Sequence, residues 1–362
     1  MSAGRFNRPR SAAAWRNVQR SERWIQSWRM DASAGVGRDD GPVRGERGIL
    51  SFSMNNEERS TEGRKDTDLY FTRVISSAPN VALLLGHLYL EGHDPSITRV
   101  MLLRDGTFYF VYDLPDITYG ATLLQATDEQ PLAFAMLGRR GLLRINPTGQ
   151  APHDETLTLP NAYVLHLQQI AGELYACGTQ QQVHHRSADG WVRMDDGCHA
   201  PLVDQVTCGF NAMDGFGADN IYAAGEGGAL WHWDGREWQA LTSPSVWTIR
   251  VVHCMPDGSV VLAGDAGTVF RGNRVDGWRT LTVPALAHLS IEHACLFQDT
   301  LYLCAQRALL ALSGGTVERV IVPLEGHLAY YSASATAGAM WTVGDDAILR
   351  FDGTHWERFS CQ

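Results

Sequence analysis

The sequence lacks the features that mark a membrane-spanning or disulfide-bonded protein. Its 362 residues contain no run of about 18 apolar residues, which argues against a transmembrane helix. The seven cysteines are odd in number and form no Cys-x-x-Cys pair, so neither a disulfide framework nor a zinc site is indicated. Most of them lie in apolar stretches, which favours buried thiols in a reducing compartment. We therefore expect a soluble cytoplasmic protein.

Glycine, by contrast, is abundant and recurs at regular intervals. The chain contains 36 glycines, and seven of them follow short polar stretches typical of hairpin turns. Successive members of this set are 38 to 45 residues apart, with a mean of about 41, which is the spacing of four-stranded propeller blades. The set consists of Gly106, Gly149, Gly190, Gly235, Gly277, Gly315 and Gly353.

A second marker recurs in phase with the first. Short apolar runs end in a small residue in each unit from the second onward, at Gly138, Gly178, Gly225, Gly264, Ala305 and Gly344. A four-stranded blade cannot bury both faces alone, so such units stack radially and close into a ring. The sequence therefore predicts an all-β fold, a seven-bladed β-propeller of four-stranded antiparallel blades. An open β-sandwich or a solenoid is the alternative.

The unit boundaries follow from these markers. We expect the propeller to occupy residues 54–362, with units at about 67–116, 117–160, 161–203, 204–244, 245–285, 286–325 and 326–360. In the longer first unit the four expected strands are VALLLG, HLYLEG, ITRVMLL and TFYFVYDL. The stretch from Ala218 to Leu241 shows the pattern best, with two tight turns between three short apolar runs.

The first 53 residues lie outside the repeat and differ from it in charge. They carry ten arginines against five acidic residues, whereas the remainder carries 20 basic and 35 acidic residues. Trp15, Trp24, Ile25 and Trp28 would share one face of a short basic helix, which is one interpretation. The other is a disordered extension, or an over-extended reading frame whose true start is Met54. No apolar stretch of signal-peptide length follows the basic residues.

Two units carry a resemblance to a known family. The segments IYAAGEGGALWHWDGREW and MWTVGDDAILRFDGTHW resemble repeats of bacterial propeller proteins of the kelch-like, WD-repeat-like and sialidase-repeat-like kinds. The similarity covers units 4 to 7 well and units 1 to 3 loosely. The Gly-His and Trp-Asp pairs of WD repeats are missing in register, and Ser187 to Trp191 lacks the spacing of a sialidase Asp-box. Such motifs specify a blade and not a function.

One end of the predicted ring gathers charged turn residues. The turns between second and third strands lie on one face of a propeller, so side chains from five units should form a rim there. Acidic residues from three units would bind a basic partner, whereas the alternative is that Asp and Gly simply make good hairpin turns. The predicted partner-binding residues are Arg139, Arg140, Glu226, Asp265, Arg307, Asp345 and Asp346.

Histidine and tryptophan recur at equivalent positions. His166, His253 and His293 fall on predicted first strands, where three imidazoles would converge on a central channel and hold a metal; satisfied core histidines are the alternative. We assign no metal and no cofactor. Tryptophans that follow the Asp-Gly turns are expected to pack between blades and not to bind ligands. They are Trp191, Trp238, Trp278 and Trp356.

No catalytic residue can be assigned. The sequence has no Gly-x-Ser-x-Gly elbow, and residues 225–230 lack the lysine and helix of a phosphate-binding loop. His253 and Cys254 are adjacent, so strand alternation places their side chains on opposite faces. Glycosidase chemistry needs two carboxylates about 5 to 9 Å apart, and no pair is singled out.

These observations favour a non-enzymatic, monomeric propeller that offers a rigid acidic surface to a protein partner. Such a surface repels nucleic acid and suits a basic target. Similarity to propellers encoded beside secreted bacterial toxins implies an immunity protein that neutralises a toxin, for example a nuclease, in the cytoplasm. Two further hypotheses stay open: a carbohydrate-active lyase or glycosidase that acts at the channel mouth, and a scaffold subunit of a larger assembly.

Overall fold

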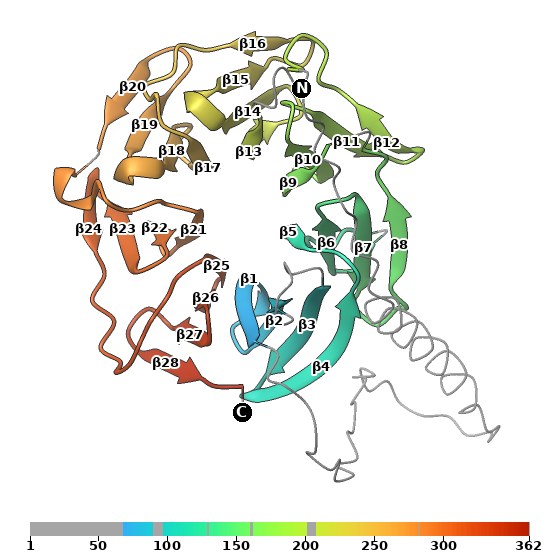
Figure 1. Ribbon diagram of the computed structural model, residues 1–362, viewed down its shortest axis with the longest axis vertical. Coiled ribbons are helices and arrows are strands. Elements are labelled where there is room, and N and C mark those ends of the chain that lie inside the picture. The colour runs from blue at the N-terminus through green and yellow to red at the C-terminus, as the bar shows by residue number, and fades with distance from the viewer. Residues whose placement is uncertain are drawn as a thin grey trace, which may run out of the picture. The chain divides into compact units, whose positions relative to one another are not determined.

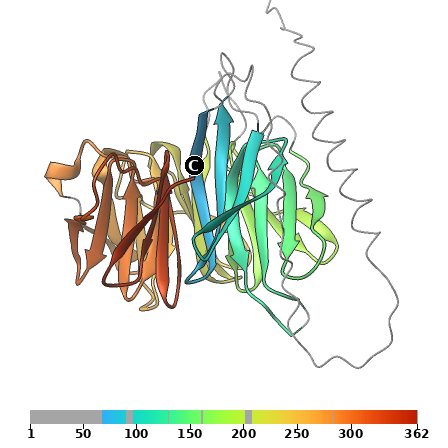
Figure 2. The same cartoon turned by 90° about the horizontal axis from the view of Figure 1, so that it is seen from below.

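The structure is a computed structural model that describes residues 68–89, 97–128, 130–159, 162–200, 208–281 and 283–361. Seven four-stranded antiparallel sheets surround a common axis, and each sheet uses four consecutive strands (Figure 1). This confirms the predicted seven-bladed β-propeller. The strands run between the two faces of the ring, as the side view shows (Figure 2). The predicted basic extension, residues 1–53, lies outside the described residues.

The blades follow the predicted units. The first four consist of β1 (Asp68–Ala78), β2 (Val81–Tyr89), β3 (Ile97–Arg104) and β4 (Thr107–Leu114); β5 (Thr118–Leu124), β6 (Ala133–Gly138), β7 (Leu142–Pro147) and β8 (His153–Thr156); β9 (Val164–Ile170), β10 (Glu173–Gly178), β11 (Val183–Ser187) and β12 (Gly190–Arg193); β13 (Phe210–Gly217), β14 (Asn220–Gly225), β15 (Leu230–Trp233) and β16 (Trp238–Ala240).

The remaining three blades consist of β17 (Ile249–Cys254), β18 (Val260–Gly264), β19 (Val269–Asn273) and β20 (Gly277–Thr280); β21 (His293–Phe297), β22 (Thr300–Ala305), β23 (Ala308–Ser313) and β24 (Thr316–Arg319); β25 (Ser332–Thr336), β26 (Ala339–Gly344), β27 (Ala347–Phe351) and β28 (Trp356–Phe359). Three short 3₁₀ turns interrupt this pattern in the described chain: η1 (Glu226–Gly228), η2 (Asp265–Gly267) and η3 (Pro284–Leu286).

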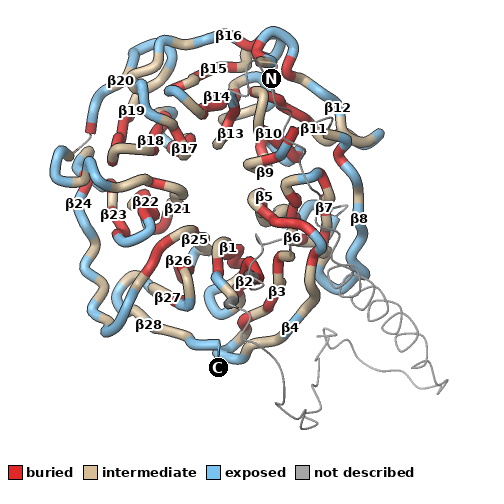
Figure 3. The backbone as a smooth tube through the Cα atoms, in the orientation of Figure 1, coloured by how far each residue is buried: buried red, intermediate tan, exposed pale blue. Residues whose placement is uncertain are grey.

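The core lies between the blades. In the described residues the buried apolar side chains form seven clusters, and each joins two neighbouring blades. The second strand of a blade is the most buried, as in β18 and β26, whereas the fourth is largely exposed, as in β20 (Figure 3). Each sheet thus buries both faces against its neighbours, which a single blade cannot do.

Both glycine markers have a structural cause. The seven turn glycines join the third strand of each blade to the fourth, and all have positive φ, which residues without a Cβ adopt at little cost. The second marker reflects close packing. A Cβ at Gly225 would lie 1.7 Å from the carbonyl oxygen of Gly209, the residue before the innermost strand of the same blade. Glycine at this position lets the two backbone segments approach.

The ring closes between the last blade and the first. Phe71 N donates a hydrogen bond to Asp345 O (2.8 Å), and Ser76 N donates one to Ser334 Oγ (2.9 Å). Arg350 Nε also donates to Pro79 O, in the β1–β2 turn (2.7 Å). An apolar cluster that includes Trp341 fills the space between these two blades. Closure therefore rests on packing between complete sheets.

The prediction for the first blade was wrong in its strand assignment. VALLLG and HLYLEG were expected to be separate strands, but β2 (Val81–Tyr89) runs through both, and the first strand is β1 (Asp68–Ala78). Gly86 does not end the strand; it accommodates the neighbouring strand, because a Cβ there would lie 2.5 Å from Leu69 Cδ1. A glycine inside a strand can mark such close approach as well as a turn.

Two further findings bear on the class of protein. All seven cysteines are free thiols. Among the described residues, no helix is long and apolar enough to cross a membrane.

Candidate functional site

The seven predicted partner-binding residues all lie in turns between the second and third strands of their blades. We call these side chains the rim residues, and we call the face that carries these turns the upper face. The turns are β6–β7 for Arg139 and Arg140, β14–β15 for Glu226, β18–β19 for Asp265, β22–β23 for Arg307, and β26–β27 for Asp345 and Asp346.

Backbone hydrogen bonds tie these turns to the neighbouring blades. Val164 N donates to Arg139 O (2.9 Å), and Ile291 N donates to Gly264 O (3.1 Å). The same turn in the last blade places Asp345 at φ 49°, a conformation that aspartate tolerates better than most residues. The upper face is therefore a rigid platform, and its turn residues have a structural role whether or not they bind a partner.

Asp265 belongs to a charged network. Arg250 Nε donates to Asp265 Oδ1 (2.7 Å), and Ser290 Oγ lies 2.6 Å from the same oxygen. Burial alone would raise the pKa of the Asp265 carboxyl, but hydrogen bonds from Arg250 and Ser290 outweigh burial and lower the pKa below its ordinary value. Arg250 also lies 3.6 Å from Glu292.

Glu226 completes this network. Burial lowers the pKa of Arg250, whereas Asp265, Glu292 and Glu226 raise it, and the net shift is upward. Asp265 and Glu292 thus contact one guanidinium where blades 5 and 6 meet, and Glu226 of blade 4 adds a third negative charge that acts on it. We call Glu226, Arg250, Asp265 and Glu292 the acidic sector of the upper face. Its formal charge is negative.

The two acids of the last blade differ in their surroundings. Asp345 accepts a hydrogen bond from the Tyr331 hydroxyl (2.6 Å) and lies 3.5 Å from His327 Nε2. Asp346 is far more open, with 78% of its side chain exposed, and lies 3.8 Å from Arg358. Asp346 is therefore the more accessible carboxylate for a partner.

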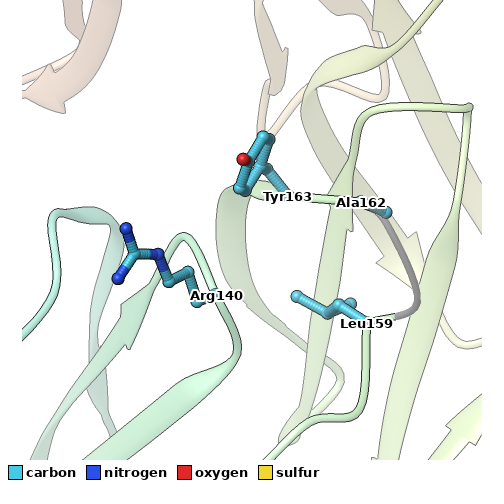
Figure 4. Close-up of a pocket in the computed structure, with 4 residues that line it drawn as sticks. All are labelled: Arg140, Leu159, Ala162 and Tyr163. Atoms are coloured by element: carbon cyan, nitrogen blue, oxygen red, sulfur yellow. The ribbon is translucent and has the colours of Figure 1, made fainter. Parts of the chain in front are cut away.

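The basic rim residues occupy a separate part of the face. Arg139 Nε lies 3.9 Å from Asp116 Oδ1, and its guanidinium lies 5.6 Å from the centre of the Tyr163 ring. Arg140, Leu159, Ala162 and Tyr163 line a cavity of about 450 Å³ (Figure 4). The exposed Arg140 side chain forms no ion pair with any described residue. We call Arg139 and Arg140 the basic sector.

Arg307 lies outside both sectors. It is exposed in the β22–β23 turn, and its carbonyl oxygen accepts a hydrogen bond from Arg319 (3.1 Å). The structure therefore does not gather all seven rim residues into one cluster. It separates a negative region over blades 4 to 6 from a positive one over blade 2.

A residue pair that the sequence analysis did not single out lies beside the acidic sector. Val246 and Trp247, in the connection between β16 and β17, are 81% and 56% exposed. Trp247 lies outside the register of the tryptophans that follow the Asp-Gly turns, and this break in the repeat was the available sequence evidence.

The repeated tryptophans pack between blades, as predicted. Trp238 is 5% exposed, and its Nε1 donates to Met194 O of the preceding blade (2.7 Å). Trp278 likewise packs edge-on against Tyr222 of the blade before it. Trp191 and Trp356 also join the clusters that they share with the preceding blade.

His166, His253 and His293 lie on the innermost strands β9, β17 and β21, as predicted. His166 Nε2 lies 3.1 Å from Met213 O, and His293 Nδ1 accepts from Ala333 N (3.4 Å). Burial lowers the pKa of His166 to about 4 and that of His293 to about 3. Among the described residues, no three His, Cys, Asp or Glu side chains are grouped to hold a metal ion.

The innermost strands also hold two charged residues that the sequence analysis missed. Asp214 on β13 lies 4.0 Å from His253 Nδ1, and burial raises its pKa. Arg73 on β1 donates to Tyr119 O of the next blade (3.2 Å). These contacts cross between blades, so spacing along the chain did not reveal them.

Comparisons with known proteins place this geometry among propellers. No family model matches the chain. Over 190 residues the chain is 34% identical to the immune protein Tsi7 of Pseudomonas aeruginosa; the match covers 52% of this chain and 61% of Tsi7. The matched part thus spans about three-fifths of that curated relative.

Solved structures resemble the chain in fold. The WD40 β-propeller domain of Doa1 superposes with a TM-score of 0.59 at 13% identity, covering 79% of this chain and 93% of that one. Virginiamycin B lyase from Staphylococcus aureus gives a TM-score of 0.54 at 12% identity, covering 68% and 84%. At such identities these matches support the fold alone. The chain is thus a seven-bladed β-propeller with sequence similarity to a bacterial immune protein.

Proposed function

We propose that the chain is an immunity protein, a non-enzymatic propeller that binds a cognate bacterial toxin in the cytoplasm and neutralises it. The observation that carries this proposal is the 34% identity to the immune protein Tsi7 over 190 residues. The free cysteines support a reducing compartment.

The surface through which it binds is the upper face. Its turns are held by hydrogen bonds between blades, so a partner meets a backbone that needs little reordering, which lowers the entropic cost of binding. Within it, the acidic sector and Asp346 offer carboxylates to a basic partner. Residues 54–362 carry 35 acidic against 20 basic residues, so long-range attraction speeds encounter with such a partner.

The partner is a basic toxin, such as a nuclease, whose active site the rigid face covers. A nuclease needs cationic residues to hold phosphate, and carboxylates fixed on a propeller compete for those residues. The chain acts as a monomer in this proposal. Asp265 is already engaged by Arg250 and Ser290, and its lowered pKa makes it a poor general acid near neutral pH.

Co-expression tests the proposal. The protein encoded by the reading frame adjacent to the chain's own gene is produced in a bacterial host, with or without the chain. We expect growth arrest without the chain, growth with it, and a complex of the two that co-purifies. An unrelated seven-bladed propeller is the control and should not protect. Absence of both protection and a complex would contradict the proposal.

Neutralising the rim acids tests which face binds. A variant with Glu226→Gln, Asp265→Asn, Asp345→Asn and Asp346→Asn should associate about tenfold more slowly at low salt, with a smaller difference at high salt, because screening weakens surface attraction. Stopped-flow measurement gives the rates. A control with equal charge change on the opposite face carries Asp105→Asn, Asp189→Asn, Asp276→Asn and Asp299→Asn. Equal rates for both variants would exclude the rim acids.

A further inference from the structure

Val246 and Trp247 form an exposed apolar pair on the upper face. Their exposed fractions are 81% and 56%, although removal of a tryptophan side chain from water lowers the free energy. No repeat position requires them, since the packing tryptophan of blade 4 is Trp238.

The loop that presents this pair is held in place by hydrogen bonds. Ser243 Oγ donates to Ser245 O (3.0 Å), and Trp247 N donates to Ser245 Oγ (2.9 Å). These side chains satisfy backbone groups of the loop itself, as Ser does in turns. Little conformational entropy would be lost when a partner covers Trp247.

The two neighbouring turns support this loop from both sides. A Cβ on Gly228 would lie 2.0 Å from Ser245 O, so η1 lies directly against the loop. Asp265 N donates to Thr248 O (3.0 Å), which fixes the end of the loop to η2. Each of these two turns also carries a carboxylate, Glu226 or Asp265. The exposed tryptophan therefore stands between two acidic residues on an ordered backbone.

We propose that Val246 and Trp247 are the anchor by which the chain grips its toxin: Trp247 enters an apolar pocket on the toxin whose edge carries Arg or Lys residues facing Glu226 and Asp265. This rests on the proposed function, because it names the part of the upper face that contributes most to affinity. Tryptophan is enriched among residues that dominate binding, and flanking charges that exclude water and set orientation complete such a site.

Truncation of the anchor tests the inference. The probe is the adjacent-frame protein, purified in an inactivated form, and the measurement is its Kd by calorimetry. Trp247→Ala should raise Kd about 30-fold or more, and Trp247→Phe less than tenfold, because phenylalanine keeps part of the apolar surface. Val275→Ala is the matched control. Val275 is 79% exposed but lies in the β19–β20 turn on the opposite face, so its loss should leave Kd unchanged.

The outcomes separate the two proposals. If the unaltered chain does not bind the probe, the proposed function fails. If the unaltered chain binds and Trp247→Ala binds equally well, with its melting temperature preserved, only the anchor is overturned. Self-association in sedimentation that Trp247→Ala abolishes would assign the pair to a second copy of the chain. Tighter binding by a chain that begins at Met54 would assign it to contact with residues 1–53. Either result would also overturn the anchor.

Discussion

Trp238 and Trp247 lie nine positions apart and belong to opposite kinds of region. Trp238 sits between blades 3 and 4, where it is 5% exposed and hydrogen-bonded to Met194 O. Trp247 lies on the upper face and is 56% exposed. The first occupies a position that recurs in other blades; the second does not. In a repeat protein, residues in register stabilise the ring, whereas residues out of register are available for recognition.

The same contrast applies to charged residues. Arg250 holds Asp265 and Glu292 together where blades 5 and 6 meet, whereas Arg140 lines a cavity and forms no ion pair with the described residues. One arginine thus stabilises an inter-blade contact, and the other leaves its charge open to solvent. Replacing a residue that joins two blades should therefore destabilise the fold, whereas replacing a residue that is open to solvent should not.

Trp238→Ala should lower the free energy of unfolding by about 3 to 5 kcal/mol, because it leaves a cavity between two sheets and removes the hydrogen-bond donor of the Met194 carbonyl oxygen. Trp247→Ala should change it by less than about 0.5 kcal/mol, since the side chain is exposed. Chemical denaturation followed by circular dichroism measures both. Similar losses for the two variants would show that Trp247 supports the fold.

Arg250→Ala should lower the free energy of unfolding by about 1 to 2 kcal/mol, because Asp265 and Glu292 then repel each other without a cation between them. Arg140→Ala should change it by less than about 0.5 kcal/mol. The difference should shrink in high salt, which screens the repulsion. Thermal melts at two salt concentrations measure these effects, and equal melting temperatures for the two variants would contradict the division.

The pH dependence of stability should distinguish a histidine of the innermost strands from an exposed one. The pKa of His293 is lowered to about 3, below that of an unfolded chain near 6.5, so the unfolded state takes up the proton first. Stability is full above about pH 6.5 and falls as pH drops toward 3. We expect a loss of about 1 to 2 kcal/mol from His293 between pH 7 and 5. His293→Gln should flatten this slope, and His355→Gln, at an exposed site, should not.

Much of the fold could be predicted from the sequence because its two glycine markers report backbone requirements. Gly235 needs positive φ, and Gly225 allows contact with the Gly209 carbonyl. Each of these backbone requirements selects glycine at one position, so the residue type itself reports it. The first blade was assigned wrongly because Gly86 sits inside a strand for reasons of packing against Leu69, which no turn pattern reveals.

The candidate site was less predictable. Strand order placed the rim residues on one face, but their partners come from other parts of the chain: Asp265 meets Arg250 and Ser290, and Asp116 meets the backbone N–H of Arg140. Likewise, Asp214 of blade 4 lies 4.0 Å from His253 of blade 5. Which side chains pair between blades depends on the strand register and on the rotation of one blade relative to the next. The spacing of residues along the chain shows neither. Only Trp247 could in principle have been found from the sequence, because it is a tryptophan outside the register of the repeat.

The way in which the ring closes has a consequence for engineering. Because each described sheet is made of four consecutive strands, no sheet depends on segments from distant parts of the chain. The bonds from Phe71 to Asp345 and from Arg350 to Pro79 are made between finished sheets, like those at other junctions. A circular permutant that links Phe359 to Asp68 and starts instead at Gly315, in the β23–β24 turn on the opposite face, would retain every strand pairing. New ends could thus be moved away from the binding face, for attachment of a label or an immobilisation tag.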